Sequence, residues 1–160
     1  MRPVAFLPAA LLALSAAIAA NAQSLNWRDL ARRADLIAFG HCEAAESSWD
    51  EEHRFIVTII RFQPQRIFKG SGAGAVTVKL LGGNIGAEGM IASHSAAMAT
   101  GEDSVLFLQR SRFGNYFVVT GGAEGKLSVR TDKISGRPRI RGTLSLDDFS
   151  QWLNGVTGSP

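Results

Sequence analysis

The chain has 160 residues, with 17 Lys and Arg, 14 Asp and Glu, and a formal net charge of +3 at pH 7. This length suits a single domain, because compact domains commonly run to roughly 100–150 residues and bury a workable core. The one cysteine, Cys42, excludes an internal disulfide, so packing alone must hold the fold. We expect Cys42 to be buried and inert, with pairing to a cysteine of a partner as the alternative.

Residues 1–22 have the pattern of a cleavable export signal. Arg2 supplies a positive start, the run 4–20 is apolar or small almost throughout, and a small-x-small triplet closes the segment at Ala22. Because the run is short and rich in alanine, removal is favoured over a retained membrane anchor. We therefore predict cleavage between Ala22 and Gln23, giving a nearly neutral, periplasmic or secreted protein with no stable membrane anchor.

Residues 23–156 are predicted to form one domain, followed by a flexible tail at 157–160. The domain opens with a short capped helix at 24–33, where apolar residues recur at helical spacing. The apolar stretch 36–42 is too short for a second helix and is predicted as the first strand, leading into a polar turn at 46–52.

Two strands and a long loop follow. Residues 55–62 are rich in β-branched and aromatic side chains, and the extended pattern resumes at 66–68. Pro64 cannot donate a ladder hydrogen bond, so it marks the bulge or bend that a strand curving around a closed barrel needs. Residues 75–81 alternate apolar and polar side chains, which indicates a half-buried strand. The glycine-rich segment 82–100 is predicted as a long loop containing one short strand.

The second half of the domain supplies the remaining strands and a closing helix. Residues 104–109 are apolar on both faces, which predicts a central strand with the core on one side and a covering element on the other. Shorter strands are predicted at 116–120, 126–130 and 139–142. A helix is predicted at 144–155, because its apolar residues fall on one face.

This closing helix has clear end signals. Ser145 can cap its first turn, and Gly155 can end it in the left-handed conformation. Five or six strands with glycine-rich corners, bracketed by short helices, suit a small barrel or sandwich, and a continuous βαβ pattern is absent.

Seven segments carry a resemblance to known domains: residues 34–40, 57–59, 67–70, 76–78, 101–108, 114–119 and 121–127. Their order resembles a widespread group of uncharacterised exported bacterial domains over most of residues 24–155. More distantly, as a skeleton of strands and corners, it is similar to the netrin-like module of tissue inhibitors of metalloproteases. The resemblance implies a mainly β fold, an OB-like barrel of five to six strands flanked by short N- and C-terminal helices, and a partner that is another protein.

The inhibitory mechanism of that module does not carry over. Those inhibitors grip the catalytic zinc of a protease with a cysteine at the mature N-terminus and staple it with disulfides. Here the mature chain is predicted to begin near Gln23, and Cys42 stands alone.

Three residues could in principle hold a metal ion. His41 and Glu43 are two apart and would share a strand face, and His53 lies beside an acidic turn. No tight ligand spacing joins them, so we expect neither a metal nor another cofactor, and interpret them as a strand-edge histidine and a solvated turn.

The sequence contains fragments of catalytic motifs, but none of these motifs is complete. Ser93 and Ser95 flank His94, but a nucleophile also needs an orienting acid, and the chain has no Gly-x-Ser-x-Gly elbow. The glycine run 82–86 lacks the following helix or Walker lysine of a phosphate site. We therefore expect a binding protein more than an enzyme.

A basic stretch lies near the end of the domain: Arg130, Lys133, Arg137, Arg139 and Arg141. OB barrels bind single-stranded nucleic acid through such charge combined with stacking aromatics. This stretch has no aromatic and the protein is predicted to be exported, so no nucleic-acid partner is expected. A solvated hairpin is favoured, with an anionic surface or an acidic protein as the functional alternative.

The function predicted from the sequence is an exported, non-enzymatic module that binds a protein partner, such as an exported protease. Its predicted binding residues are Gly82, Gly83, Asn84, Ile85, Gly86, Met90 and His94. The alternative is a secreted metal- or small-ligand-binding protein, or a hydrolase, that uses His41, Glu43 and His53. A purely structural role in the envelope is a third possibility.

Overall fold

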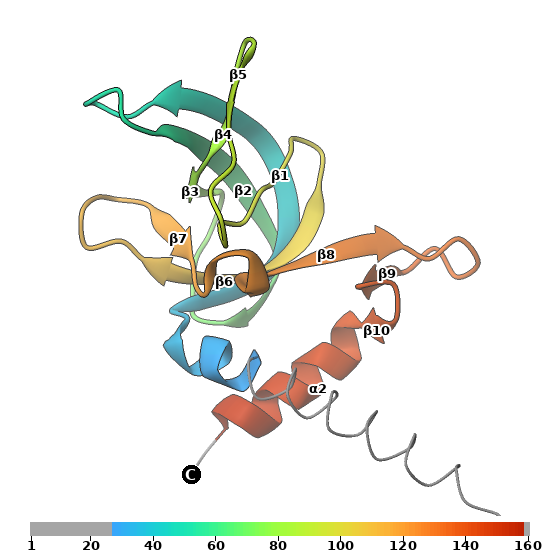
Figure 1. Ribbon diagram of the computed structural model, residues 1–160. Coiled ribbons are helices and arrows are strands. Elements are labelled where there is room, and N and C mark those ends of the chain that lie inside the picture. The colour runs from blue at the N-terminus through green and yellow to red at the C-terminus, as the bar shows by residue number, and fades with distance from the viewer. Residues whose placement is uncertain (1–26, 159–160) are drawn as a thin grey trace, which may run out of the picture.

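The computed structural model describes residues 27–158, so the predicted export signal and its cleavage site lie outside the described residues. The chain is mainly β (Figure 1). Its elements, in order, are a helical segment at 27–33, β1 (Leu36–Trp49), β2 (Ile56–Lys69), β3 (Val76–Leu81), β4 (Gly83–Ile85), β5 (Glu88–Met90), β6 (Asp103–Arg110), β7 (Phe117–Val119), the 3₁₀ helix η1 (Gly122–Gly125), β8 (Lys126–Thr131), β9 (Pro138–Ile140), β10 (Leu144–Ser145) and the helix α2 (Leu146–Thr157).

Five of the strands close into a barrel. They follow the order β1, β2, β3, β7, β6, and β6 pairs back to β1. β3 and β7 are parallel, while the other neighbouring pairs around the ring are antiparallel. β8 joins β6 outside the ring, and β9 and β10 extend it further. The predicted mainly β, OB-like barrel with a short helix at each end of the domain is thereby confirmed.

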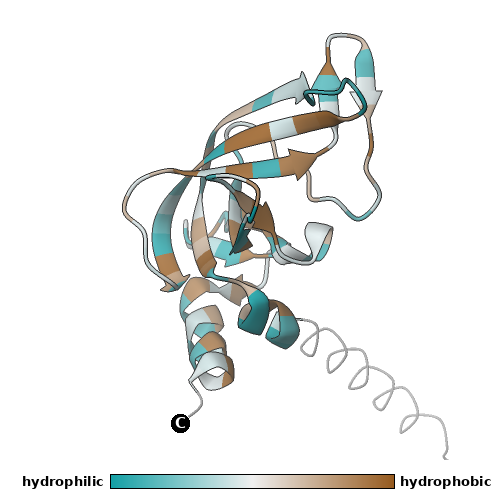
Figure 2. Cartoon of the chain, turned by 90° about the vertical axis from the view of Figure 1, so that its left-hand side faces the viewer, coloured by the Kyte–Doolittle hydropathy of each residue, from teal (hydrophilic) through white to brown (hydrophobic). Residues whose placement is uncertain are grey.

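β6 lies between two hydrophobic cores. Leu106 and Leu108 are buried with the barrel interior, whereas Val105 and Phe107 are buried on the opposite face, beneath the two helices. Figure 2 shows hydrophobic residues gathered along the barrel strands and on part of α2. The prediction of a central strand with a core on one side and a covering element on the other is confirmed.

The long strands β1 and β2 bend through bulges. Phe39 pairs with Arg66 and Gly40 pairs with Pro64, so one residue of β2 between these pairs is skipped. This bulge lies beside Pro64, as the missing N–H of proline predicted, and it joins the expected strands at 55–62 and 66–68 into one element.

β1 is longer than the sequence suggested. The predicted polar turn at 46–52 is wrong at its start, because the strand continues to Trp49, which pairs with Ile56. Glu46 and Ser48 point to solvent while Ser47 between them is half-buried, so polar residues occupy the outer face of a paired strand.

The β1–β2 turn is organised by a carboxylate. Asp50 Oδ1 accepts hydrogen bonds from the backbone N–H of Arg54 at 2.6 Å and of Phe55 at 3.0 Å. The hydrogen bond from Phe55 is the main cause that holds the pKa of Asp50 below its ordinary value.

Replacing Asp50 by a neutral residue is therefore expected to make the stability of the protein fall less as the pH is lowered. Because the folded pKa is depressed, its contribution is present above the unfolded pKa of about 3.9 and is lost as the pH falls through the folded pKa. Asp50→Asn keeps an acceptor oxygen but removes this titration, so its urea midpoint should fall less than that of the parent between about pH 5 and pH 2. The exposed neighbour supplies the control, Glu51→Gln. Parallel curves for Asp50→Asn and the parent would contradict the prediction.

α2 begins at Leu146, directly after the predicted cap, and ends later than predicted. Ser145 Oγ accepts a hydrogen bond from the backbone N–H of Asp148 at 3.0 Å, which confirms the cap. The predicted end at Gly155 is wrong, because the helix runs to Thr157 and the partly buried Val156 packs against the core. No helix in the described range is long and apolar enough to cross a membrane.

Candidate functional site

Residues 82–100, which we call the mouth loop, connect β3 to β6 across one end of the barrel (Figure 1). The segment first forms the β4–β5 hairpin, two short strands where the sequence predicted one. On its return, Ala96 and Met98 are buried among barrel-interior side chains that include Leu80. The mouth loop therefore caps this end of the barrel.

The start of the mouth loop rests on two hydroxyl groups. Thr58 Oγ1 donates a hydrogen bond to the carbonyl of Gly82 at 2.6 Å. Since a hydroxyl has one proton, Ser47 Oγ must be the donor in the 2.9 Å contact with Thr58 Oγ1. A Cβ at position 83 would lie 2.3 Å from Thr58 Oγ1 and 2.4 Å from Ser47 Oγ. Only glycine lets the backbone approach this pair so closely.

The middle of the mouth loop is held by its backbone. The carbonyl of His94 accepts a hydrogen bond from the backbone N–H of Ala123 in η1 at 2.8 Å. His94 itself adopts a left-handed conformation, with φ of 66°, and its side chain is exposed. His94 therefore holds the mouth loop in place through its backbone carbonyl and not through its side chain.

The end of the mouth loop is tied to β8 by charge. Lys126 Nζ lies 2.5 Å from Glu102 Oε1 and also donates to the carbonyl of Ala97. The other carboxylate oxygen of Glu102 accepts from the backbone N–H of Ala99 at 3.1 Å. The Lys126 side chain is only 13 % exposed, so this pair is better shielded from solvent than the other ion pairs of the described chain.

A groove of about 620 Å³, the mouth groove, lies between the mouth loop and strands β1 to β3. Its volume falls within the range of roughly 300–1,000 Å³ that is usual for ligand pockets. Small side chains form part of its lining: Ala45, Ala92, Ala96, Ala97 and Ala99. Larger apolar side chains form the rest of the apolar lining: Leu80, Leu81, Met90, Ile91 and Met98.

The mouth groove is lined by few ionisable side chains. Among its lining residues there is no His, Cys, Asp, Lys or Arg, and the one carboxylate, Glu102, already faces Lys126. The hydroxyl of Thr58 is already donated to the loop backbone. The lining also carries the polar side chains of Ser47, Asn84, Ser95 and Thr100, and apolar side chains form the larger part of it.

The structure brings four of the seven predicted binding residues to the groove. Gly82, Gly83, Asn84 and Met90 line it. The other three, Ile85, Gly86 and His94, belong to the same loop but are outside the lining.

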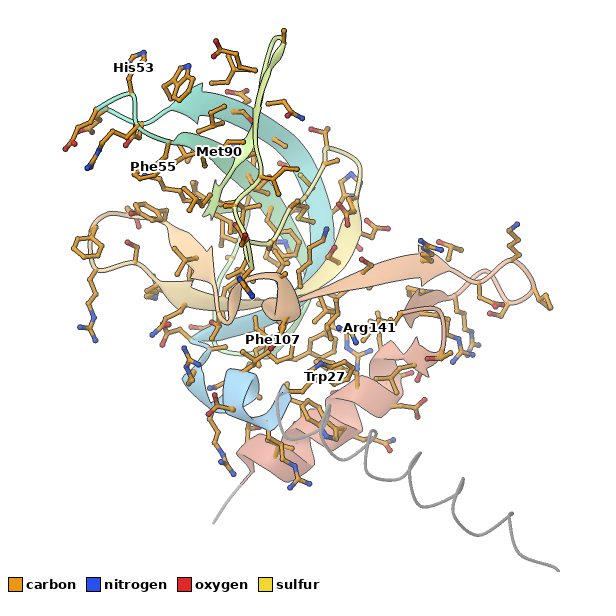
Figure 3. The ribbon with its side chains drawn as sticks, in the orientation of Figure 1. Trp27, His53, Phe55, Met90, Phe107 and Arg141 are labelled. Atoms are coloured by element: carbon orange, nitrogen blue, oxygen red, sulfur yellow. The ribbon has the colours of Figure 1, made fainter. Side chains whose placement is uncertain are left out.

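His41, Glu43 and His53 are not brought together. His41 Nδ1 is 2.7 Å from Asp103 Oδ1, and Glu43 Oε2 is 2.6 Å from Arg61 Nε. His53 lies in the β1–β2 turn, beyond the end of β1 at Trp49 (Figure 3). Across the described residues, no group of three His, Cys, Asp or Glu side chains could hold a metal ion.

Sequence reasoning missed the alanines of the groove and its hydroxyl pair. The run 92–99 consists largely of small residues, which no propensity or motif singles out. Ser47 and Thr58 could be found only from the register that places them opposite each other. Ile91 could have been predicted as a binding residue, because it is a large apolar residue within a glycine-rich loop.

Cys42 lies in the barrel interior, fully buried. Burial raises the pKa of its thiol above the ordinary value. A buried, protonated thiol is a poor nucleophile, so the interpretation of Cys42 as a buried, inert cysteine fits its position.

No family model matches this chain, and no curated protein sequence matches it at a significant level. What the molecule offers for a functional assignment is therefore its own geometry.

Proposed function

We propose that this domain is an exported, non-enzymatic binding module whose mouth groove takes an apolar segment of a protein partner, such as an exported protease. The observation that carries the proposal is the groove itself, with the alanines and the larger apolar side chains of its lining. Small lining residues leave room for an incoming side chain, and the unbranched Met90 and Met98 can adapt their shape to it.

Exposed apolar residues around the groove support a macromolecular partner. Ile91 lines the groove and is 98 % exposed. Leu81 also lines it and is 46 % exposed. Apolar patches of this kind mark interaction sites, because leaving them in water is unfavourable.

Export and the resemblance to the exported bacterial domains and the netrin-like module belong to the same proposal. The closed five-stranded barrel fits the fold that the resemblance implies. Because the mature chain is predicted to begin near Gln23 without a cysteine, the proposal assigns the partner contact to the mouth loop and not to the N-terminus.

A photoactivatable crosslinker at position 91 tests the proposal. In Ile91→Cys, the label should react only there, because Cys42 is buried and its thiol pKa is raised. Incubated with envelope and medium proteins of its source, the labelled domain should capture one protein at native expression levels. Ala99→Trp, which puts a large side chain on an exposed lining residue, should abolish that capture.

Matched variants separate the groove from the general surface. Phe113→Cys carries the same label on a side chain that is 94 % exposed but outside the groove, and should not capture the protein. Ala73→Trp adds the same bulk at an exposed position elsewhere, and should leave capture unchanged. Equal capture from position 113, capture that survives Ala99→Trp, or no capture at all would each refute the proposed function.

A further inference from the structure

The β8–β9 hairpin extends beyond the barrel. β6 pairs with β8 only from Lys126 to Ser128, and from Val129 onward β8 pairs with β9 alone. In Figure 1 this two-stranded ribbon and its loop protrude to one side of the molecule, away from β7. The loop at 132–137 therefore projects into solvent, where it can meet a flat surface.

Positive charge on this hairpin is offset only in part, by the electrostatic attraction between Arg139 and Asp132. Arg130 and Arg139 are directly opposite each other in the ladder, an arrangement that is destabilising for like charges. Lys133 and Arg137 follow on either side of the loop. Within the described part of the chain, none of these four cations forms an ion pair with a carboxylate. An external anion would reduce the repulsion between Arg130 and Arg139.

The one acidic residue of the loop is used to shape it. Asp132 Oδ1 accepts hydrogen bonds from the backbone N–H of Ile134 at 3.2 Å and from the backbone N–H and hydroxyl of Ser135, each at 2.7 Å. These bonds fix a tight turn with Ile134 on it, and the Ile134 side chain is 98 % exposed. An isoleucine is thus presented to solvent between Lys133 and Arg137.

We infer that this hairpin docks the domain reversibly on an anionic phospholipid membrane. Lys133 and Arg137 contact headgroup phosphates, Ile134 inserts between the headgroups, and Arg130 and Arg139 add long-range attraction. Cations beside an exposed apolar tip are what an anionic interface selects, because attraction and apolar burial act at the same depth. This inference does not depend on the mouth groove or on its partner.

The shape of the hairpin favours lipid over the other polyanions. A protruding apolar tip needs a yielding surface, whereas an acidic protein would have to provide a matching pocket for Ile134. Single-stranded nucleic acid would call for stacking aromatics, and residues 130–139 contain none.

Vesicle sedimentation tests the inference with the protein purified after export, so that the apolar run 4–20 is absent. The protein should bind vesicles of phosphatidylglycerol mixed with phosphatidylcholine, and bind phosphatidylcholine alone far less. Lys133→Gln combined with Arg137→Gln should lower the partition coefficient about 30-fold, since each cation at such a surface contributes about fivefold. Salt should weaken binding, because the screening length falls from about 10 Å at 0.1 M to about 3 Å at 1 M.

A control variant removes the same charge elsewhere. Lys79 and Arg112 lie on β3 and in the turn before β7, on the other side of the barrel (Figure 1). Lys79→Gln combined with Arg112→Gln should therefore change the partition coefficient much less than the hairpin variant. An equal loss in both variants would reduce the effect to net charge and overturn the inference.

A local probe makes the result independent of any other lipid contact. An environment-sensitive fluorophore on Ile134→Cys should shift to the blue on anionic vesicles, whereas the same fluorophore on Ala73→Cys, an exposed position whose neighbours 70–76 carry no charge, should not. Equal binding to neutral vesicles, or an unshifted probe at 134 on vesicle-bound protein, would overturn the inference. So would a blue shift that appears only with a soluble acidic protein or a nucleic acid.

Discussion

Phe149→Ala is expected to lower the free energy of unfolding by about 3–5 kcal/mol. Phe149 of α2 is fully buried, and its ring centroid lies 5.0 Å from that of Phe68 and 6.1 Å from that of Phe107, both edge-on. Trp27 of the N-terminal helical segment and Trp152 contact the same ring. One side chain thus joins both helices to the outer face of the barrel, and its removal leaves a cavity among aromatics that cannot easily collapse.

Urea unfolding followed by tryptophan fluorescence measures this loss, because Trp27 and Trp152 report on that core directly. The thermal midpoint should fall by about 10–20 °C for a domain of this size. Gln151→Ala, on the exposed side of the same helix, should stay within about 0.5 kcal/mol of the parent. A loss below about 1 kcal/mol for Phe149→Ala would mean that α2 does not pack on the barrel as described.

Elements whose sequence pattern reflects a local cause were predictable. β6 is apolar on both faces because two cores meet on it. The bulge beside Pro64 follows from an N–H that proline lacks, and the cap at Ser145 follows from a side-chain oxygen placed before a helix. Each of these signals is contained in a few consecutive residues.

Features set by pairing between distant segments were not predictable. The outer face of β1 carries Glu46 and Ser48, and only the β2 partner shows that these polar residues belong to a strand. Gly155 has the composition of a helix end, but the burial of Val156 extends α2 past it, so tertiary packing overrides a local signal.

The sequence predicted which segment forms the candidate site, but not which of its side chains line the groove. Glycine content and loop length pointed to residues 82–100, and four of the seven chosen positions line the groove. Which side chains face inward depends on three anchors, at Gly82, His94 and Glu102. The partners of these anchors lie 24 to 29 residues away in the sequence, on other elements of the fold. No spacing rule connects an anchor with its partner.

Gly122→Ala is expected to displace the mouth loop and to abolish partner capture at the mouth groove. Gly122 has φ of 61°, and a Cβ at this position would lie 1.9 Å from the carbonyl oxygen of His94. That oxygen is the acceptor for Ala123 N–H, so the clash falls on the central anchor of the loop. A backbone atom cannot move aside as a side-chain tip can, so either residues 92–95 shift or η1 unwinds.

Gly136→Ala separates the clash from the backbone cost of a left-handed alanine. Gly136 has φ of 66°, nearly the same as Gly122, but no atom lies within 4 Å of the Cβ that alanine would add. It should lose only the left-handed cost of about 1–2 kcal/mol and keep a native mouth loop. Gly122→Ala should lose clearly more in urea, and amide exchange at Ala123 should accelerate toward that of an exposed N–H. The barrel strands keep their own pairing in Gly122→Ala. The core around Phe149 should therefore stay folded even though the mouth groove is lost. Equal losses for the two variants, with Ala123 still protected, would show that the mouth loop is not held through the carbonyl of His94.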